Sequence, residues 1–168
     1  MNWSEYKILL VDDEKDFVTG LARLLAVEYP ALEILSAGSP QEALDICAQK
    51  SIPLVISDLQ MPGMDGFEVA GLMRRNKETQ ETPIIFVTAI SKEERHVFKG
   101  YEVGAVDYLP KPIDSDILKS KVKVFLEMNR QKKLLEIQSK ELEQQMGTLE
   151  TEIAHRKKVE QELLEAKK

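Results

Sequence analysis

The chain has 168 residues, 43% of them apolar, which is enough to fill the core of one ordinary domain and leaves room for an appendage but not for a second full domain. Its formal net charge of −6 comes from residues 1–128, which hold 21 Asp and Glu against 14 Lys and Arg, whereas residues 129–168 hold 8 against 9. Because there is no basic excess and no apolar run near the roughly 18 residues of a membrane span, we expect a cytoplasmic protein whose partners are proteins, not nucleic acid or a membrane.

Short apolar runs alternate with amphipathic stretches in the first part of the chain. The run at 8–11 suits a strand covered on both faces, and Ser39-Pro40 suits the start of a helix, because an N-cap precedes proline at the first helical position. We predict strands at 7–11, 32–37, 53–57, 83–88 and 106–109, and helices at 17–29, 40–49, 67–76, 91–103 and from about 114 onward. This alternation requires parallel strands with right-handed crossovers and helices on both faces. The predicted fold class is α/β, a doubly wound five-stranded parallel sheet.

The last part of the chain differs in composition from the first. No proline follows Pro112, and from Asn129 onward there is no aromatic residue and only one glycine. A heptad pattern places Phe125, Lys132, Ser139, Met146 and Ile153 at a positions and Met128, Leu135, Leu142 and Leu149 at d positions. We therefore divide the chain into a domain at 1–127 and a helical extension at 128–168.

This extension has the properties of a coiled coil. A continuous helix over 114–166 would be about 80 Å long at 1.5 Å per residue, and one domain of this size cannot cover its apolar stripe, so we expect a parallel homodimer. A solvated linker helix is the alternative, because Lys132 and Ser139 weaken the seam, and a stutter is expected after Ile153. The chain ends inside the helical pattern without a cap, so we expect it to be part of a longer protein.

Polar residues follow four of the five predicted strands. Asp12 and Asp13 follow the first strand, Asp58 the third and Lys111 the fifth, and Thr88 ends the fourth. In an open α/β sheet these carboxyl ends share the edge at which ligands bind. Clustered carboxylates repel one another unless a cation neutralises them, and their hard oxygen atoms favour Mg2+. A carboxylate beside Mg2+, with a hydroxyl and an ammonium to bind the transferred oxygens, is suited to accept a phosphoryl group.

Four ordered segments together match a known family. They are the paired acids at 12–13, Asp58-Leu59-Gln60-Met61-Pro62-Gly63-Met64-Asp65-Gly66, Val87-Thr88-Ala89, and Gly104-Ala105-Val106-Asp107-Tyr108-Leu109-Pro110-Lys111-Pro112. Over residues 5–127 the chain closely resembles the receiver domains of bacterial two-component response regulators. The resemblance implies the strand order 2-1-3-4-5 and favours a cis Lys111-Pro112 bond.

The resemblance also implies a role for each acidic residue. Asp58 would accept a phosphoryl group from a histidine kinase or a phosphotransfer protein. Asp13 and Asp58 would bind Mg2+ together with the main-chain carbonyl of Gln60, and Asp12 would act through a metal-bound water. The chain would be a phosphoacceptor and a switch, with no enzymatic activity beyond self-phosphotransfer and autodephosphorylation.

Three further residues would respond to the phosphoryl group. By the same resemblance, Lys111 would pair with the phosphate, Thr88 would move its hydroxyl onto a phosphate oxygen, and Tyr108 would turn inward into the vacated space. The coiled coil would pass this change to a downstream effector. A histidine kinase, a PAS domain and a diguanylate cyclase domain are all compatible with the connector at 156–168.

Three other functions fit parts of the pattern. A phosphatase of the haloacid dehalogenase type needs Asp-x-Asp after the first strand and a cap insertion, whereas this chain has Asp12-Asp13-Glu14 and short loops. A flavodoxin-like electron carrier needs a hydroxyl-rich phosphate loop and flanking aromatic residues, which the sequence lacks. The third is a degenerate receiver that serves only as a dimerisation scaffold, and the presence of the complete set of site residues argues against it.

Overall fold

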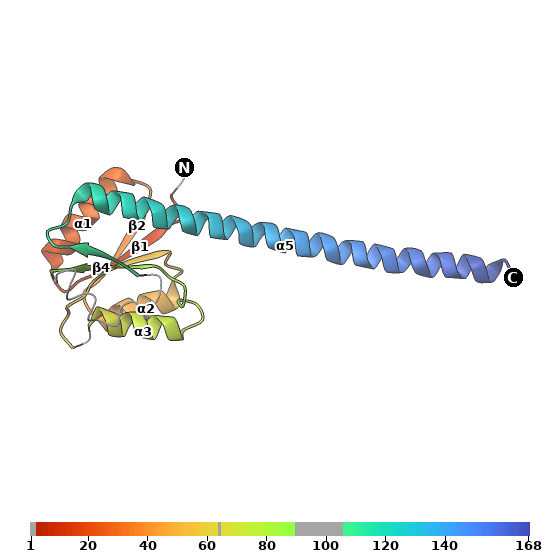
Figure 1. The fold of residues 1–168 in the computed structure, drawn as a ribbon, viewed down its shortest axis with the longest axis horizontal. Coiled ribbons are helices and arrows are strands. Elements are labelled where there is room, and N and C mark those ends of the chain that lie inside the picture. The colour runs from red at the N-terminus through yellow and green to blue at the C-terminus, as the bar shows by residue number, and fades with distance from the viewer. Residues whose placement is uncertain (1–2, 64, 90–105) are drawn as a thin grey trace. The chain divides into compact units, whose positions relative to one another are not determined.

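The computed structural model describes residues 3–63, 65–89 and 106–168 (Figure 1). These residues confirm the predicted α/β fold, because five parallel strands form one sheet in the order β2-β1-β3-β4-β5. The strands are β1 (Lys7–Val11), β2 (Glu33–Ala37), β3 (Leu54–Asp58), β4 (Ile84–Thr88) and β5 (Val106–Pro110). The helices among the described residues are α1 (Lys15–Glu28), α2 (Pro40–Gln49), α3 (Gly66–Arg75) and α5 (Ser115–Ala166). The helix predicted at 91–103 lies outside the described residues.

Side-chain caps fix where three of the helices begin. The hydroxyl of Ser39 accepts the N–H of Glu42 at 3.2 Å, and the carboxylate of Asp65 accepts the N–H of Glu68 at 2.8 Å. Asp114 caps the amides of the first turn of α5 in the same way. Each cap satisfies backbone donors that have no partner within the helix, so these polar residues end the preceding loops at defined positions.

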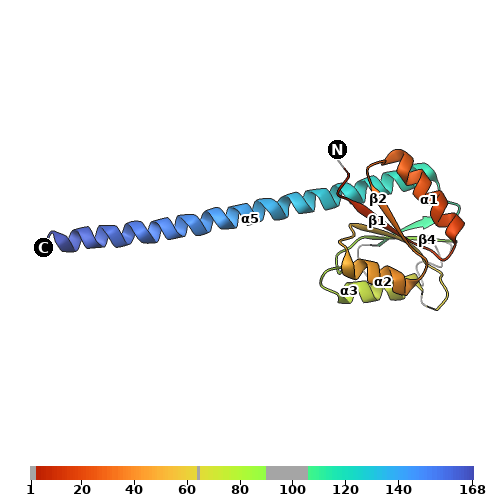
Figure 2. The ribbon, with the colours of Figure 1, turned by 180° about the vertical axis from the view of Figure 1, so that it is seen from behind.

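Helices cover both faces of the sheet. Figures 1 and 2 show α1 and the beginning of α5 on one face, and α2 with α3 on the other. Strand residues alternate between these faces, so that Ile8 and Leu10 pack towards α1 and α5 whereas Leu9 and Val11 pack towards α2 and α3. The helix residues buried in these two cores are Leu21, Leu25, Leu118, Val122 and Leu126 on the first face and Ala43, Cys47, Val69, Ala70 and Met73 on the second. Burial on both faces explains the continuous apolar runs of β1, β3 and β4, whereas β2 at the side of the sheet is partly exposed.

An aromatic cluster joins the N-terminal segment to the α1 and α5 face. Trp3, the only tryptophan of the chain, packs edge-on against Tyr6 and Tyr29, with ring centroids 5.2 Å and 6.4 Å away. The Tyr29 hydroxyl donates a hydrogen bond to the main-chain carbonyl of Lys119 at 3.2 Å. This cluster therefore links residues 3–6, the end of α1 and the start of α5.

The chain divides into two compact units, Met1–Glu127 and Met128–Lys168. The second unit is the remainder of α5, and its apolar side chains are exposed. Those at the predicted a and d positions include Met128, Leu135, Leu142, Met146, Leu149 and Ile153, which are 50–65% exposed. Among the described helices, none combines the length and the apolar character that crossing a membrane requires.

Gly66 gives a first test of how the fold supports the loop after β3. A Cβ at Gly66 would lie 2.8 Å from Cε1 of Phe86 and 2.9 Å from the main-chain oxygen of Asp58, whereas a Cβ at Gly71, also in α3, would meet nothing within 4 Å. Gly66→Ala should therefore lower the free energy of unfolding by about 1–3 kcal/mol. Gly71→Ala should raise it by about 0.5–1 kcal/mol, because alanine restricts the unfolded chain. Urea unfolding measures both, and equal effects would contradict the close seating of α3 on Asp58.

Candidate functional site

The carboxyl ends of β1, β3, β4 and β5 lie at one edge of the sheet. The pairing of β1 with β3 places Asp12, which follows β1, next to Asp58. Asp58 is itself the last residue of β3, so this strand ends one residue later than predicted. On the other side, Thr88 pairs with Pro110, and the N–H of Lys111 donates to the Thr88 carbonyl at 2.9 Å. The sheet therefore brings the residues predicted for the site to one edge.

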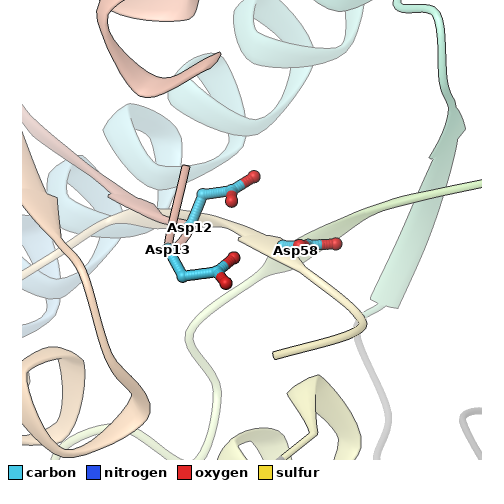
Figure 3. Close-up of side chains that lie close together, drawn as sticks. All are labelled: Asp12, Asp13 and Asp58. Atoms are coloured by element: carbon cyan, nitrogen blue, oxygen red, sulfur yellow. The ribbon is translucent and has the colours of Figure 1, made fainter. Parts of the chain in front are cut away.

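Three carboxylates lie together at this edge, with the side chains of Asp12 and Asp13 extending towards Asp58 (Figure 3). One oxygen atom from each lies within 4.8 Å of those from the other two. Asp12 and Asp58 are buried, with 4% and 8% of their surface exposed, whereas Asp13 is exposed. Backbone amides hold the two buried ones, because Asp12 Oδ1 accepts the N–H of Glu14 at 2.9 Å and Asp58 Oδ1 accepts the N–H of Gln60 at 3.3 Å. The triad combines two fixed carboxylates with one that faces solvent.

Burial makes two of these carboxylates costly to ionise. It raises the pKa of Asp12 to about 6, and the charge of Asp58 adds to this increase, while the Glu14 amide and the Lys111 ammonium oppose it. Burial also raises the pKa of Asp58, against the lowering effect of the same ammonium and of the Gln60 amide. A cation between the three carboxylates would favour their charged forms. Because the donors are all hard oxygen atoms, the triad fits a Mg2+ ion.

Lys111 contributes a positive charge to this edge. Its Nζ atom lies 3.7 Å from Asp58 Oδ1 and 3.8 Å from Asp12 Oδ2. The Lys111-Pro112 peptide bond is cis, which confirms the expectation from the family resemblance. A carboxylate nucleophile, further carboxylates for a metal and an ammonium for phosphoryl oxygens are thus within reach of one another.

Thr88 and Tyr108 are both buried beside this edge. Thr88 is 1% exposed at the end of β4, and Tyr108 is 9% exposed on β5. The Tyr108 ring lies 5.9 Å from that of Phe86 and belongs to the core on the α2 and α3 face. The structure therefore places a hydroxyl on β4, which pairs with β3, and an aromatic ring on β5, which pairs with β4. Their proposed movement stays a prediction.

Sequence reasoning missed one neighbour of the site, Phe17. The Lys111 ammonium lies 4.5 Å from the centroid of the Phe17 ring. The sequence places Phe17 at the start of the helix predicted at 17–29, and in the structure it also packs on the core. The signal available was an aromatic residue in the first turn of the helix that follows the paired acids.

Known proteins resemble the chain over the residues that form this site. The family model of the response regulator receiver domain matches residues 8–123. A probable cyclic di-GMP phosphodiesterase of Vibrio cholerae is 40% identical over 140 residues, which are 83% of this chain and 31% of that protein. The cyclic di-GMP phosphodiesterase response regulator RpfG of Xanthomonas campestris is 30% identical over 94% of this chain and 43% of its own length. The transcriptional regulatory protein YvrH of Bacillus subtilis is 36% identical over 75% of this chain and 51% of its own length.

Solved structures of receiver proteins also resemble the chain. The chemotaxis protein CheY4 of Vibrio cholerae superposes with a TM-score of 0.65 at 28% identity, covering 71% of this chain and 98% of CheY4. The signal receiver domain of a histidine kinase from Syntrophus aciditrophicus gives 0.65 at 27% identity, covering 73% and 90%. The chain spans about a third to a half of the length of the curated relatives above. With the sheet order and the acidic edge, the match over residues 8–123 shows that the chain belongs to the response regulator receiver domain family.

Proposed function

We propose that Asp58 accepts a phosphoryl group from the phosphohistidine of a histidine kinase or phosphotransfer protein, in a reaction that depends on Mg2+. The observation that carries this proposal is the Asp12, Asp13 and Asp58 triad, with the Lys111 ammonium 3.7 Å from Asp58. A carboxylate oxygen of Asp58 forms the bond to phosphorus while the phosphorus–nitrogen bond of the donor breaks, and the electron pair of that bond stays on the histidine nitrogen. A histidine kinase is the partner that a receiver domain implies.

The triad is of the kind typical of the Mg2+ site of receivers. In our proposal Asp13, Asp58 and the main-chain carbonyl of Gln60 would hold Mg2+, and Asp12 would act on the metal through a water molecule. When bound, Mg2+ supplies positive charge that offsets the carboxylates and the phosphoryl oxygens. The amide contacts of Asp12 and Asp58 support this arrangement, because they fix one oxygen of each side chain and leave the other available.

The phosphoryl group would be sensed by three side chains, those of Lys111, Thr88 and Tyr108. The Lys111 ammonium is farther from both buried carboxylates than a hydrogen bond, so it can turn to a phosphoryl oxygen. Thr88 moves its hydroxyl onto another phosphoryl oxygen, and Tyr108 repacks inward in the space that Thr88 leaves. New charge at Asp58 thereby shifts the population of two packings of β4 and β5.

The signal then passes along α5 to an output domain. Exposed apolar side chains at the predicted a and d positions support a parallel dimeric coiled coil. Similarity to the two cyclic di-GMP phosphodiesterases covers 83% and 94% of this chain, against 75% for YvrH, which supports an output in cyclic di-GMP signalling. The chain itself is a cytoplasmic phosphoacceptor without other enzymatic activity, and the alternative is a scaffold that is never phosphorylated.

Phosphorylation of Asp58 is tested by intact mass. Incubation with Mg2+ and acetyl phosphate should add one phosphoryl group to the wild-type chain, and chelation of the metal should abolish the adduct. Asp58→Ala should give none, because it removes the nucleophile. Asp45→Ala, which removes an exposed carboxylate on α2, should be phosphorylated like the wild type. An unmodified wild type that also fails to bind beryllofluoride would favour the scaffold alternative.

Asp12→Asn tests the electrostatic cost of the metal site. The pKa of Asp12 is raised from 3.8 to about 6, so the folded chain holds the proton of this carboxyl group more tightly than the unfolded chain does. The stability that protonation of Asp12 contributes is therefore present below about pH 4 and is lost as the pH rises through 6. Without Mg2+, Asp12→Asn should therefore raise the free energy of unfolding at pH 7.5 by about 1–3 kcal/mol, and much less at pH 4. It should also reduce the stabilisation that Mg2+ gives the wild type.

The control for this experiment is Asp16→Asn, which removes the same charge from an exposed position on the first turn of α1. Urea unfolding at both pH values, with and without Mg2+, measures the four conditions. A gain for Asp16→Asn as large as that for Asp12→Asn would assign the effect to net charge and not to the buried site.

Two exposed apolar residues of α5 test the coiled coil. Leu142 lies at a predicted d position, and Ile137 lies outside the seam. Their exposed fractions in the single helix are nearly equal, at 57% and 55%. In a dimer only Leu142 is buried, so Leu142→Lys should convert the dimer to monomer whereas Ile137→Lys should leave it intact. Sedimentation equilibrium measures the mass, and a wild-type chain that is monomeric at all concentrations would support the solvated linker helix.

A further inference from the structure

Phe17 places an aromatic ring against the lysine of the site. It is the third residue of α1, and the Lys111 ammonium lies 4.5 Å from its ring centroid, within the range of a cation–π interaction. Phe17 is partly buried and packs against the core formed by α1 and α5. The ring is therefore held by the core on one side and contacts the ammonium on another.

The ammonium of Lys111 is shared among three groups. Its distances are 3.7 Å to Asp58 Oδ1, 3.8 Å to Asp12 Oδ2 and 4.5 Å to the Phe17 centroid. Neither carboxylate is close enough for a hydrogen bond. Both carboxylates form ion pairs with the ammonium at these distances, and a closer, hydrogen-bonded ion pair with either would hold it there. The ring attracts the same cation through its quadrupole without offering a charged acceptor.

We propose that Phe17 is a positioning residue for phosphotransfer, because its ring holds the Lys111 ammonium over the pocket, at ion-pair distance from Asp12 but beyond a hydrogen bond with it. This inference rests on the proposed phosphorylation of Asp58. The transferring phosphoryl group carries its charge on oxygen atoms, and a cation that is already in place stabilises them without rearrangement. Without the ring, the ammonium would move onto the Asp12 carboxylate, and that ion pair would have to break before each transfer.

The experiment varies the ring at position 17 in the full chain and measures the rate constant of phosphorylation by acetyl phosphate with Mg2+. Phe17→Leu keeps an apolar side chain without a quadrupole and should be about 3- to 10-fold slower. Phe17→Trp and Phe17→Tyr keep an aromatic face and should restore the rate. Replacing Phe17 by phenylalanines with one, two and five ring fluorines weakens the quadrupole at nearly constant shape, so the rate should fall stepwise.

Two measurements distinguish a positioning role of Phe17 from a purely structural one. The thermal midpoint of each variant shows whether the rate follows stability, and the same fluorinated residues at Phe125, which packs on the same core from α5, should leave the rate unchanged. Full activity of Phe17→Leu, or a rate that follows the thermal midpoint and not the fluorine number, overturns the positioning role while phosphorylation of Asp58 stands. If the wild type accepts no phosphoryl group, the proposed function fails and this inference fails with it.

Discussion

The arrangement of this receiver depends on carboxylates that the sheet holds together against their mutual repulsion. The two apolar cores stabilise the strands, and the ends of β1 and β3 then bring Asp12 and Asp58 to the same edge. Burial raises the pKa of both carboxyl groups, so their negative charge is costly at this edge. In our proposal, a phosphoryl group on Asp58 would change the charge at this edge while the two cores hold the rest of the fold in place.

The helix α5 changes character along its length. In its first turns Leu118, Val122 and Leu126 recur every four residues and are buried in the core on the α1 face. From Met128 to Ile153 the apolar residues at the predicted a and d positions are exposed, although Ile137 lies outside the seam and is exposed as well. Four-residue spacing follows one side of a helix that packs on a sheet, whereas a heptad repeat follows the seam between two helices. The spacing of apolar residues thus changes within one continuous helix.

Much of the fold and the acidic edge could be predicted from the sequence. Continuous apolar runs marked the strands, Ser39 marked a helix start, and the rule that ligands bind at the carboxyl ends of parallel strands grouped Asp12, Asp13 and Asp58. The contact of Phe17 with Lys111 could not be predicted, because it depends on the path of one side chain between elements far apart in sequence. The close approach of α3 to the end of β3 is likewise a tertiary distance that leaves no periodic signal.

The aromatic cluster at the other edge of the sheet has a practical consequence. Because Trp3 is the only tryptophan of the chain, all indole emission comes from one partly buried ring beside Tyr6 and Tyr29. Tyr29 in turn binds the main chain of α5 at Lys119. Intrinsic fluorescence therefore works as a label-free optical reporter of how α1 and the start of α5 pack, recorded from a position remote from the acidic edge.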